Sequence, residues 1–360
     1  MRKLLGILIL LAVAAGVVVA TQVDWGSLQR TATAKQDWAD VKIFYGGEKT
    51  AFLTDPGVRK ILDKYKVRLN AAKAGSIEMA TQLPVDGVDC LWPSNQIAVE
   101  LARQAGRPVL SDTNIFNSPL VFYAWRPVTE AFLKTGVAAR NNGVLTVDTL
   151  KLAQRVQQQK RWKEDLGLDV YGALKIFSTD PRSSNSGNMW AGLLANTLNG
   201  GNVVAAADLP KVLPEVQAYF RAMGYMEHSS GDIFENFLKQ GMGARPIIVG
   251  YENQLVEFVI AHQEYRDVIR DKIDILYPAP TVFASHPLIS LTPNCKRLED
   301  ALQDQGLQAL AWKAHGFRSG LLGVGNSPDV LNVGGIPATV NQVMPLPEAA
   351  VMKRLIDALE

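Results

Sequence analysis

The sequence predicts an α/β protein built from two lobes, and three observations support that fold class. Strand-like and helix-like patterns alternate over residues 41–125, and the alternation begins again over residues 146–263. An extended segment that contains Pro278, Pro280 and Pro287 follows, and it indicates a connection between lobes because these prolines disfavour a helix or a central strand. With 360 residues the chain is also longer than a single hydrophobic core usually supports.

The first unit is expected to contain four strands with helices between them. A Gly46-Gly47 turn follows the first strand and leads into a helix that opens near Glu48 or Lys49. Asp55 and Pro56 occupy the cap and first-turn positions of the next helix. The expected strands are residues 41–45, 67–75, 88–92 and 119–125, and a further helix is expected after residue 95.

The second unit repeats this alternation, and the tail of the chain returns to helices. Helices are expected at 146–162, 188–200, 212–226 and 254–263, and strands at 172–180 and 246–250. The tail is predicted to place helices at 297–316 and 346–360 around a glycine-rich loop at 320–335.

The N-terminus predicts export. Arg2 and Lys3 precede an uninterrupted apolar run over residues 4–20, so residues 1–25 form a signal peptide or an N-terminal membrane anchor, followed by a linker over residues 26–40. Both outcomes leave the remaining chain outside the cytoplasm, by the positive-inside rule. We therefore expect a periplasmic or extracellular protein, with residues 4–20 either removed or kept as an anchor in the cytoplasmic membrane.

Charge and cysteine content narrow the function classes. Lys and Arg total 37 against 35 for Asp and Glu, and this net charge of +2 gives no basic field of the kind that attracts nucleic acid. The chain has two cysteines, Cys90 and Cys295. In an exported protein they can form one disulfide, and buried free thiols are the equally weighted alternative.

Four polar loops follow predicted strands, where helix N-termini in open α/β sheets point free N–H groups at a ligand. They span residues 46–50, 92–96, 178–188 and 251–254, two in each unit, and they can converge on one inter-lobe cleft. Residues 183–186 place four hydroxyl or amide side chains in a row, more than one helix cap needs.

The sequence gives little support for catalysis. The four histidines lie far apart without metal-ligand spacing, and no phosphate-binding loop, dinucleotide fingerprint or nucleophile elbow is present. Glu48 and Glu252 are the remaining candidates for an acid/base pair across the cleft. A binding protein without metal or cofactor is expected, and a hydrolase using Glu48 or Glu252 is a lesser alternative.

With these residues in view, the chain resembles the type II periplasmic solute-binding proteins over roughly residues 40–345. The resemblance is carried by YGGEKTAF, LWPSN, NSPLVFYAW, STDPRSSNSGNMWAGLLAN, VGYENQLVEF and YPAPTVFASHPLISL. The order of these segments also looks like an uncharacterised subgroup that shares the SSNSGN loop, residues 183–188.

This resemblance implies two α/β lobes joined by two crossing hinge strands, with the second lobe inserted in the first. Lobe 1 would comprise residues 41–122 and 284–360, and lobe 2 residues 123–283. The crossings would lie near residues 120–125 and 277–285. A ligand that touches both lobes only when they are closed would shift an open–closed equilibrium.

The resemblance further implies an exported substrate-binding protein that captures a small polar or anionic solute for an ABC-type importer. The expected partner is a membrane permease, and the chain itself is expected to be a monomer. Two carboxylates in the cleft would repel a bare anion, so a zwitterion or a hydroxyl-rich ligand fits better, although Lys49 and Arg182 can offset their charge. The candidate ligand-binding residues are Gly47, Glu48, Lys49, Thr50, Ser94, Asn95, Asn117, Ser118, Ser183, Ser184, Asn185, Ser186, Gly187, Tyr251, Glu252 and Asn253. A membrane-anchored two-lobe sensor or protein-interaction module is the main alternative function.

Overall fold

The computed structural model describes residues 37–331 and 333–359. The predicted signal or anchor segment, residues 4–20, lies outside the described residues, as does most of the linker. The strands and helices of the described residues belong to one compact unit that begins at Ala39. Within the described residues, no helix is both long enough and apolar enough to cross a bilayer.

The first sheet has the strand order β2-β1-β3-β9-β4. Its strands are β1 (Ala39–Tyr45), β2 (Val67–Lys73), β3 (Cys90–Trp92), β4 (Ser111–Trp125) and β9 (Phe283–Ser290). β1 pairs in parallel with β2 and β3, whereas β9 runs antiparallel to both β3 and β4. β1 buries alternate residues, Ala39, Val41 and Ile43, as expected for a strand with one covered face.

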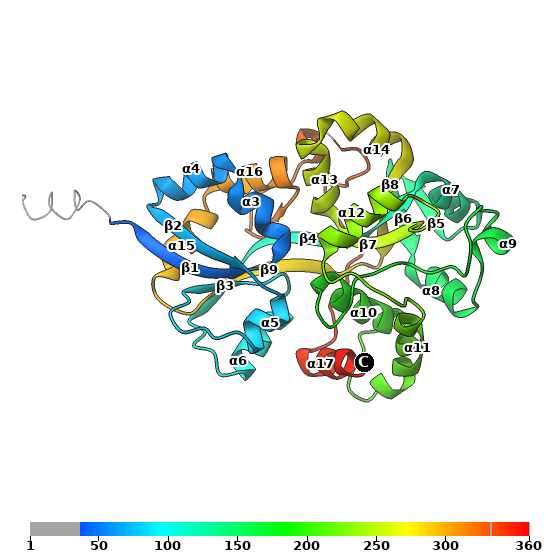
Figure 1. Ribbon diagram of the computed structural model, residues 1–360, viewed down its shortest axis with the longest axis horizontal. Coiled ribbons are helices and arrows are strands. Elements are labelled where there is room, and N and C mark those ends of the chain that lie inside the picture. Colours follow the sequence, from blue (N-terminus) through cyan, green and yellow to red (C-terminus); the bar gives the residue numbers. More distant parts are fainter. Residues whose placement is uncertain (1–36, 332, 360) are drawn as a thin grey trace, which may run out of the picture. The chain divides into compact units, whose positions relative to one another are not determined.

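Helices lie on both sides of the first sheet, and they cover both faces at β3 but only one face at β1 (Figure 1). One face packs against α3 (Thr50–Thr54), α4 (Pro56–Lys64), α15 (Cys295–Leu302) and α16 (Gln305–His315), and the other against α5 (Ser76–Thr81) and α6 (Ile97–Gln104). The predicted cap of α4 is present, because the Asp55 carboxylate accepts hydrogen bonds from the N–H groups of Gly57 and Val58. The two-sided cover explains why β3 is apolar throughout.

The second sheet uses the other half of β4. There β4 pairs antiparallel with β7 (Ile247–Tyr251) on one side and with β8 (Ile273–Ala279) on the other. The sheet continues through β6 (Val144–Asp148), parallel to β8, to β5 (Ala138–Asn141). One face packs against α7 (Arg126–Lys134), α8 (Thr149–Gln157), α9 (Trp162–Leu166), α10 (Asn185–Leu198) and α11 (Leu209–Arg221), and the other against α12 (Ser230–Gln240), α13 (Glu252–Ala261) and α14 (Arg266–Lys272).

Two connections join the sheets. β4 pairs with β9 up to Pro119 and with β7 from Leu120 onward, so a single strand belongs to both sheets. The second connection links the end of β8 to the start of β9. The two-lobed α/β fold class is therefore confirmed. The predicted lobe boundaries remain a prediction, and the C-terminal helix α17 (Ala349–Asp357) packs against α10, α11 and α6.

The expectation that the proline-rich segment forms no central strand is wrong. β8 and β9 are interior strands, each with a neighbour on both sides. Pro287 lies opposite Asn114, where the β4–β9 register shifts in a bulge, and Pro278 lies beyond the part of β8 that pairs with β4. The prolines therefore occupy places where a missing backbone N–H is tolerated.

Two further expectations in the second unit need correction. Residues 172–180 form no regular strand, and only one bridge, from Phe177 to Ile248, joins them to β7. The neighbouring backbone groups form other hydrogen bonds, since Ile176 O accepts from the Tyr219 hydroxyl and Asp180 N donates to Glu227 O. The predicted helix at 146–162 begins only at Thr149, since the residues before it belong to a β-hairpin.

Cys90 and Cys295 form a disulfide, which resolves the alternative between a pair and free thiols. The bond joins the start of β3 to the start of α15. The Cα atoms of the two cysteines lie 5.6 Å apart, and the bond closes a sequence separation of 205 residues. Both residues are fully buried in the core of the first sheet.

Replacing Cys90 and Cys295 together by Ala should lower the free energy of unfolding by about 2–4 kcal/mol, because the disulfide restricts a long loop in the unfolded chain. Urea titration of the oxidised wild type and of the double variant, both followed by circular dichroism, measures this difference. Equal midpoints and slopes would contradict the pairing.

Candidate functional site

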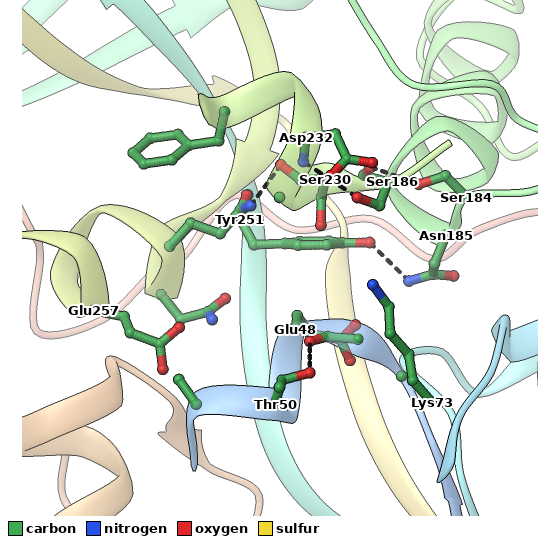
Figure 2. A pocket seen from close by; sticks show the side chains of 18 of the residues that line it. Glu48, Thr50, Lys73, Ser184, Asn185, Ser186, Ser230, Asp232, Tyr251 and Glu257 are labelled. Atoms are coloured by element: carbon green, nitrogen blue, oxygen red, sulfur yellow. Dashed lines mark hydrogen bonds between the residues drawn. The ribbon is translucent and has the colours of Figure 1, made fainter. Parts of the chain in front are cut away.

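A cavity of about 980 Å³ opens where several helices begin. Its walls come from the 3-10 turn Gly47–Lys49, α3 and the end of β2, from the N-terminal ends of α5, α10 and α12, and from α13 along most of its length. Figure 2 shows Tyr251 lying across the cavity, with Ser184, Ser186 and Asp232 on one side of its ring and Glu48, Thr50 and Lys73 on the other. Helix N-termini concentrate positive potential and free N–H donors, so this arrangement favours acceptor groups on a ligand.

The N-terminus of α10 is not capped by its own serine. Ser184 occupies the N-cap position, yet its side chain accepts no hydrogen bond from the helix backbone. Its hydroxyl instead contacts Ser186 Oγ at 3.2 Å, and Ser186 Oγ contacts Thr179 Oγ1 at 2.8 Å. Among the described residues, the backbone N–H groups of residues 185–187 have no hydrogen-bond partner. The run of hydroxyls therefore leaves the helix donors open to a ligand.

Gly187 holds this helix end against the preceding loop. It lies outside the cavity wall, and a Cβ at this position would collide with the carbonyl oxygen of Thr179 and lie 2.9 Å from Pro181 N. The close approach requires a residue without a side chain. Gly187 thus positions the N-terminus of α10, although the sequence suggested it as a ligand contact.

Asn185 links parts of both sheets beneath the cavity. Its Nδ2 donates to Ser94 O at 2.9 Å and to the Tyr251 hydroxyl at 2.8 Å, and its Oδ1 accepts from Asn95 Nδ2. Asn95 in turn accepts from Ala98 N at the start of α6. This chain of amides connects the first sheet to β7, and it orients the Tyr251 hydroxyl toward α10.

Glu48 faces the cavity from a buried charged cluster. Its carboxylate accepts from Lys49 Nζ and Ser94 Oγ and lies 3.4 Å from His286 Nδ1. Burial alone would raise the pKa of Glu48, but the charge of Lys49 and the hydrogen bond with His286 hold it well below its ordinary value. Glu48 is therefore an ionised hydrogen-bond acceptor and not an acid.

His286 is neutral in this cluster. Burial and the neighbouring charge of Lys49 lower the pKa of His286 to about 4. His286 Nδ1 lies 3.1 Å from Lys49 Nζ and 3.4 Å from the Glu48 carboxylate, whereas His286 Nε2 is buried without a partner among the described residues. Lys49 itself is fully buried, so it neutralises Glu48 and does not reach the cavity.

Two charged side chains at the cavity have no partner in the described part of the chain. Lys73, at the end of β2, and Asp232, in the first turn of α12, both line the wall, and no ion pair or side-chain hydrogen bond engages either charged group. The other lining carboxylates are engaged, because Glu78 accepts from Gly75 N and Glu257 contacts His315 Nδ1 at 2.6 Å. The cavity therefore offers one free cation and one free anion among the described residues.

Nine of the sixteen sequence-derived candidates lie on the cavity wall, and seven lie elsewhere. The wall contains Gly47, Glu48, Thr50, Ser183, Ser184, Asn185, Ser186, Tyr251 and Asn253. Lys49, Ser94, Asn95, Asn117, Ser118, Gly187 and Glu252 do not line it. Three of the four polar loops reach the cavity, whereas the loop at 92–96 lies one layer beneath it and supports Glu48 and Asn185.

Glu48 and Glu252 do not face each other across the cavity, which corrects the proposed acid/base pair. Glu252 is fully buried, binds Arg318 through both carboxylate oxygens, and accepts from the Tyr277 hydroxyl at 2.5 Å. Asn117 and Ser118 likewise form structural contacts outside the cavity. Asn117 Oδ1 accepts a hydrogen bond from Asn114 Nδ2 within β4, and Ser118 Oγ donates to Asn253 Oδ1 in α13 at 3.0 Å. Arg182 is engaged as well, by Asp180.

Sequence reasoning missed the segment at 228–232, which forms part of the cavity wall. Ser183 Oγ contacts His228 Nδ1 at 3.0 Å, and Ser229 caps α12 by accepting from Asp232 N. The pattern Ser-Ser-Gly-Asp is a helix-start signal that the sequence contains. Lys73, Ser76 and Glu78 were also missed, because nothing local indicates that the end of β2 lies beside the N-terminus of α10.

Replacing Gly187 by Ala should lower the free energy of unfolding by roughly 1–3 kcal/mol, because the new methyl group would collide with backbone atoms. Gly243→Ala is the matched control: a Cβ there meets nothing within 4 Å and the backbone is unstrained, so the change should stay within about 0.5 kcal/mol. Urea unfolding of the three proteins measures both effects, and equal stability of the two variants would contradict the close approach.

Acidification should destabilise the protein through His286. Its folded-state pKa of about 4 lies below the ordinary 6.5, so the unfolded chain takes up the proton first and stability falls as pH drops from 6.5 toward 4. Between about pH 7 and about pH 5 this contribution is about 2 kcal/mol. Denaturant titrations at both pH values should show that His286→Gln loses less stability than the wild type by this amount; identical losses would contradict a buried neutral histidine.

Comparisons with known proteins identify the fold. No protein-family model and no curated protein matches the sequence. Among solved structures, the ferric binding protein from Campylobacter jejuni matches with a TM-score of 0.58 at 13% identity, over 89% of this chain and 98% of its own. The apo ferric ion-binding protein A of Pasteurella haemolytica matches with a TM-score of 0.56 at 12% identity, over 89% and 96%.

A third structure, the periplasmic binding protein AfuA from Actinobacillus pleuropneumoniae with exogenous fructose-6-phosphate bound, matches with a TM-score of 0.55 at 14% identity, over 89% and 97% of the two chains. Among the described residues of this chain, no group of three or more His, Cys, Asp or Glu side chains is placed to hold a metal ion.

The fold implied by the sequence resemblance is confirmed: the chain has the two-lobed fold of the type II periplasmic binding proteins.

Proposed function

We propose that this chain is an exported solute-binding protein that holds a small polar solute with an anionic group in the cavity beside α10. The observation that carries the proposal is the uncapped N-terminus of α10, whose free N–H groups lie beside the hydroxyls of Ser184 and Ser186 at a cavity of about 980 Å³. Several convergent polar groups in one concave site are typical of ligand recognition.

The anionic group of the solute binds at the end of α10. The N–H groups of Asn185 and Ser186 and the Ser184 hydroxyl donate to its oxygens, and the free ammonium of Lys73 compensates its charge. Asn253 adds a buried amide, because its Nδ2 has no partner among the described residues although its Oδ1 accepts from Ser118. These donors match a carboxylate, a phosphate or another oxyanion.

The rest of the cavity favours a zwitterion or a hydroxyl-rich body. The free carboxylate of Asp232 and the ionised Glu48 both accept hydrogen bonds, so they would repel an anion that lacked donors. Thr54, Ser76 and Ser230 add further polar groups to the wall. An ammonium or several hydroxyls on the solute would satisfy this side.

The remaining elements of the proposal concern transport. The structural neighbours include proteins described as periplasmic binding proteins, and the apolar run after Arg2 and Lys3 supports export. Delivery of the solute to the permease of an ABC-type importer follows from this role. A hydrolase is less well supported, because Glu252 is held by Arg318 away from the cavity and the pKa of Glu48 is too low for an acid.

A Ser184→Ala/Lys73→Gln variant should bind the solute more weakly by roughly tenfold or more, because it loses a hydroxyl and a charge-assisted contact. The solute is first found by a thermal-shift screen of amino acids, sugar phosphates and inorganic oxyanions against the exported portion. A true ligand at about one hundred times its dissociation constant adds about 2.7 kcal/mol to stability.

The matched control is Ser111→Ala/Lys60→Gln, which makes the same changes at exposed positions away from the cavity. The cavity variant should retain its stability without ligand to within about 1 kcal/mol, since neither side chain caps a helix or forms an ion pair. A panel without any shift, or equal affinity of the two variants, would overturn the proposal.

A further inference from the structure

A second cavity, of about 290 Å³, is lined mainly by residues of α13, α14 and β8. The wall is completed by the β5–β6 hairpin, by residues 333–335 and by Arg126 at the start of α7. No residue lines both cavities: α13 contributes Leu255 and Val259 to this one, and Gln254, Glu257 and Phe258 to the first. The two cavities therefore lie on different faces of the same helix.

Four arginines line this small cavity: Arg126, Arg140, Arg266 and Arg270. Two of them are engaged. Arg126 donates to Arg270 O at 2.6 Å and to Asp274 Oδ1 at 3.2 Å, and Arg270 pairs with Asp267 and Asp271 at 2.9 and 3.0 Å. The three nearby carboxylates are thus all bound by Arg126 and Arg270.

The other two guanidinium groups have no partner in the described part of the chain. No ion pair or side-chain hydrogen bond engages Arg140 or Arg266, and the Nε atoms of Arg126 and Arg266 are buried without an acceptor. A buried donor without an acceptor is costly, and two uncompensated positive charges beside one cavity repel each other. An anion bound in the cavity would accept hydrogen bonds from the buried Nε–H groups and would neutralise the positive charge of the arginines.

The remaining wall is aliphatic. It consists of Leu145, Leu255, Val259, Ile269, Ile273, Ile275 and Val333, and three glycines, Gly143, Gly334 and Gly335, also line it. Planar guanidinium groups bind phosphate oxygens in a forked geometry, and aliphatic walls bind hydrocarbon. Asp274 Oδ2, a buried acceptor without a partner, adds a place for a hydroxyl of the same ligand.

We propose that this cavity is a second binding site, separate from the solute cavity, for an organic phosphate whose phosphate group contacts Arg140 and Arg266 and whose apolar part packs on the aliphatic wall. The same chemistry is present in a soluble alkyl phosphate and in a phospholipid headgroup region. Both sources are therefore tested.

The soluble source is tested by calorimetric titration of the full exported chain with butyl phosphate, inorganic phosphate and butanol at neutral pH and low salt. Butyl phosphate should bind at least tenfold more tightly than inorganic phosphate, because each buried methylene contributes about fourfold. Butanol should show no saturable binding, since it lacks the charge that the arginines require.

Arg140→Gln/Arg266→Gln should weaken butyl phosphate binding by roughly tenfold to one hundredfold, whereas the matched control Arg59→Gln/Arg221→Gln, with the same change in net charge at exposed positions, should stay within about twofold. Arg266→Lys keeps the positive charge but lacks the planar guanidinium group, so its affinity for butyl phosphate should lie between those of the double variant and the control. Neither Arg140 nor Arg266 lines the first cavity, so a loss of affinity in their double variant that is absent from the control assigns the binding to the second cavity.

The lipid source is tested by co-sedimentation with vesicles of phosphatidylglycerol and phosphatidylcholine. Vesicle binding that is lost in Arg140→Gln/Arg266→Gln and retained in the control would assign the site to a headgroup, and butyl phosphate binding without vesicle binding would assign it to a soluble phosphate. The proposal is overturned if the wild type binds neither probe, or if the arginine variant and its charge-matched control bind equally.

Discussion

The described structure depends on the passage of one strand through two sheets. β4 pairs with β9 up to Pro119 and with β7 and β8 beyond it, and its side chains are buried from Ser118 to Ala124. β7 pairs directly with β4, and β1 is linked to β4 through β3 and β9. The loops that follow β7 and β1 therefore both reach the cavity wall. The cavity wall, the loop at 92–96 beneath it and the hydrogen bonds of Asn185 all depend on this shared strand.

The polar layer beneath the cavity is what gives the site its shape. Ser94 and Asn95 do not line the wall, yet they hold Glu48 and Asn185, which do. Lys49 and His286 complete the charge balance around Glu48 in surroundings where an unpaired charge would be expensive. Residues chosen from the sequence as ligand contacts thus divide into those that face the cavity and those that orient them.

Some features of the sequence carried their meaning locally. The cap at Asp55 is confirmed. The helix after the serine-rich loop and the strand near Tyr251 are also present, although α10 begins at Asn185, inside the predicted loop, and β7 includes Tyr251. Asn142 and Gly143 form the positive-φ turn of the β5–β6 hairpin. This Asn-Gly pair is a local hairpin signal, and the prediction of a helix over 146–162 did not use it. The Ser229 cap of α12 is a second signal of the same kind.

The sequence by itself determined the α/β class, the loops rich in hydroxyls and amides, and the two cysteines that are able to pair, because capping, strand alternation and turn chemistry depend on neighbouring residues. Only the tertiary structure decided that β8 and β9 are interior strands, that Glu252 binds Arg318 rather than facing Glu48, and that Lys73 and Asp232 remain without partners among the described residues at the cavity. These outcomes depend on contacts between residues far apart in the chain. No local pattern encodes which of several possible partners a buried charge will meet.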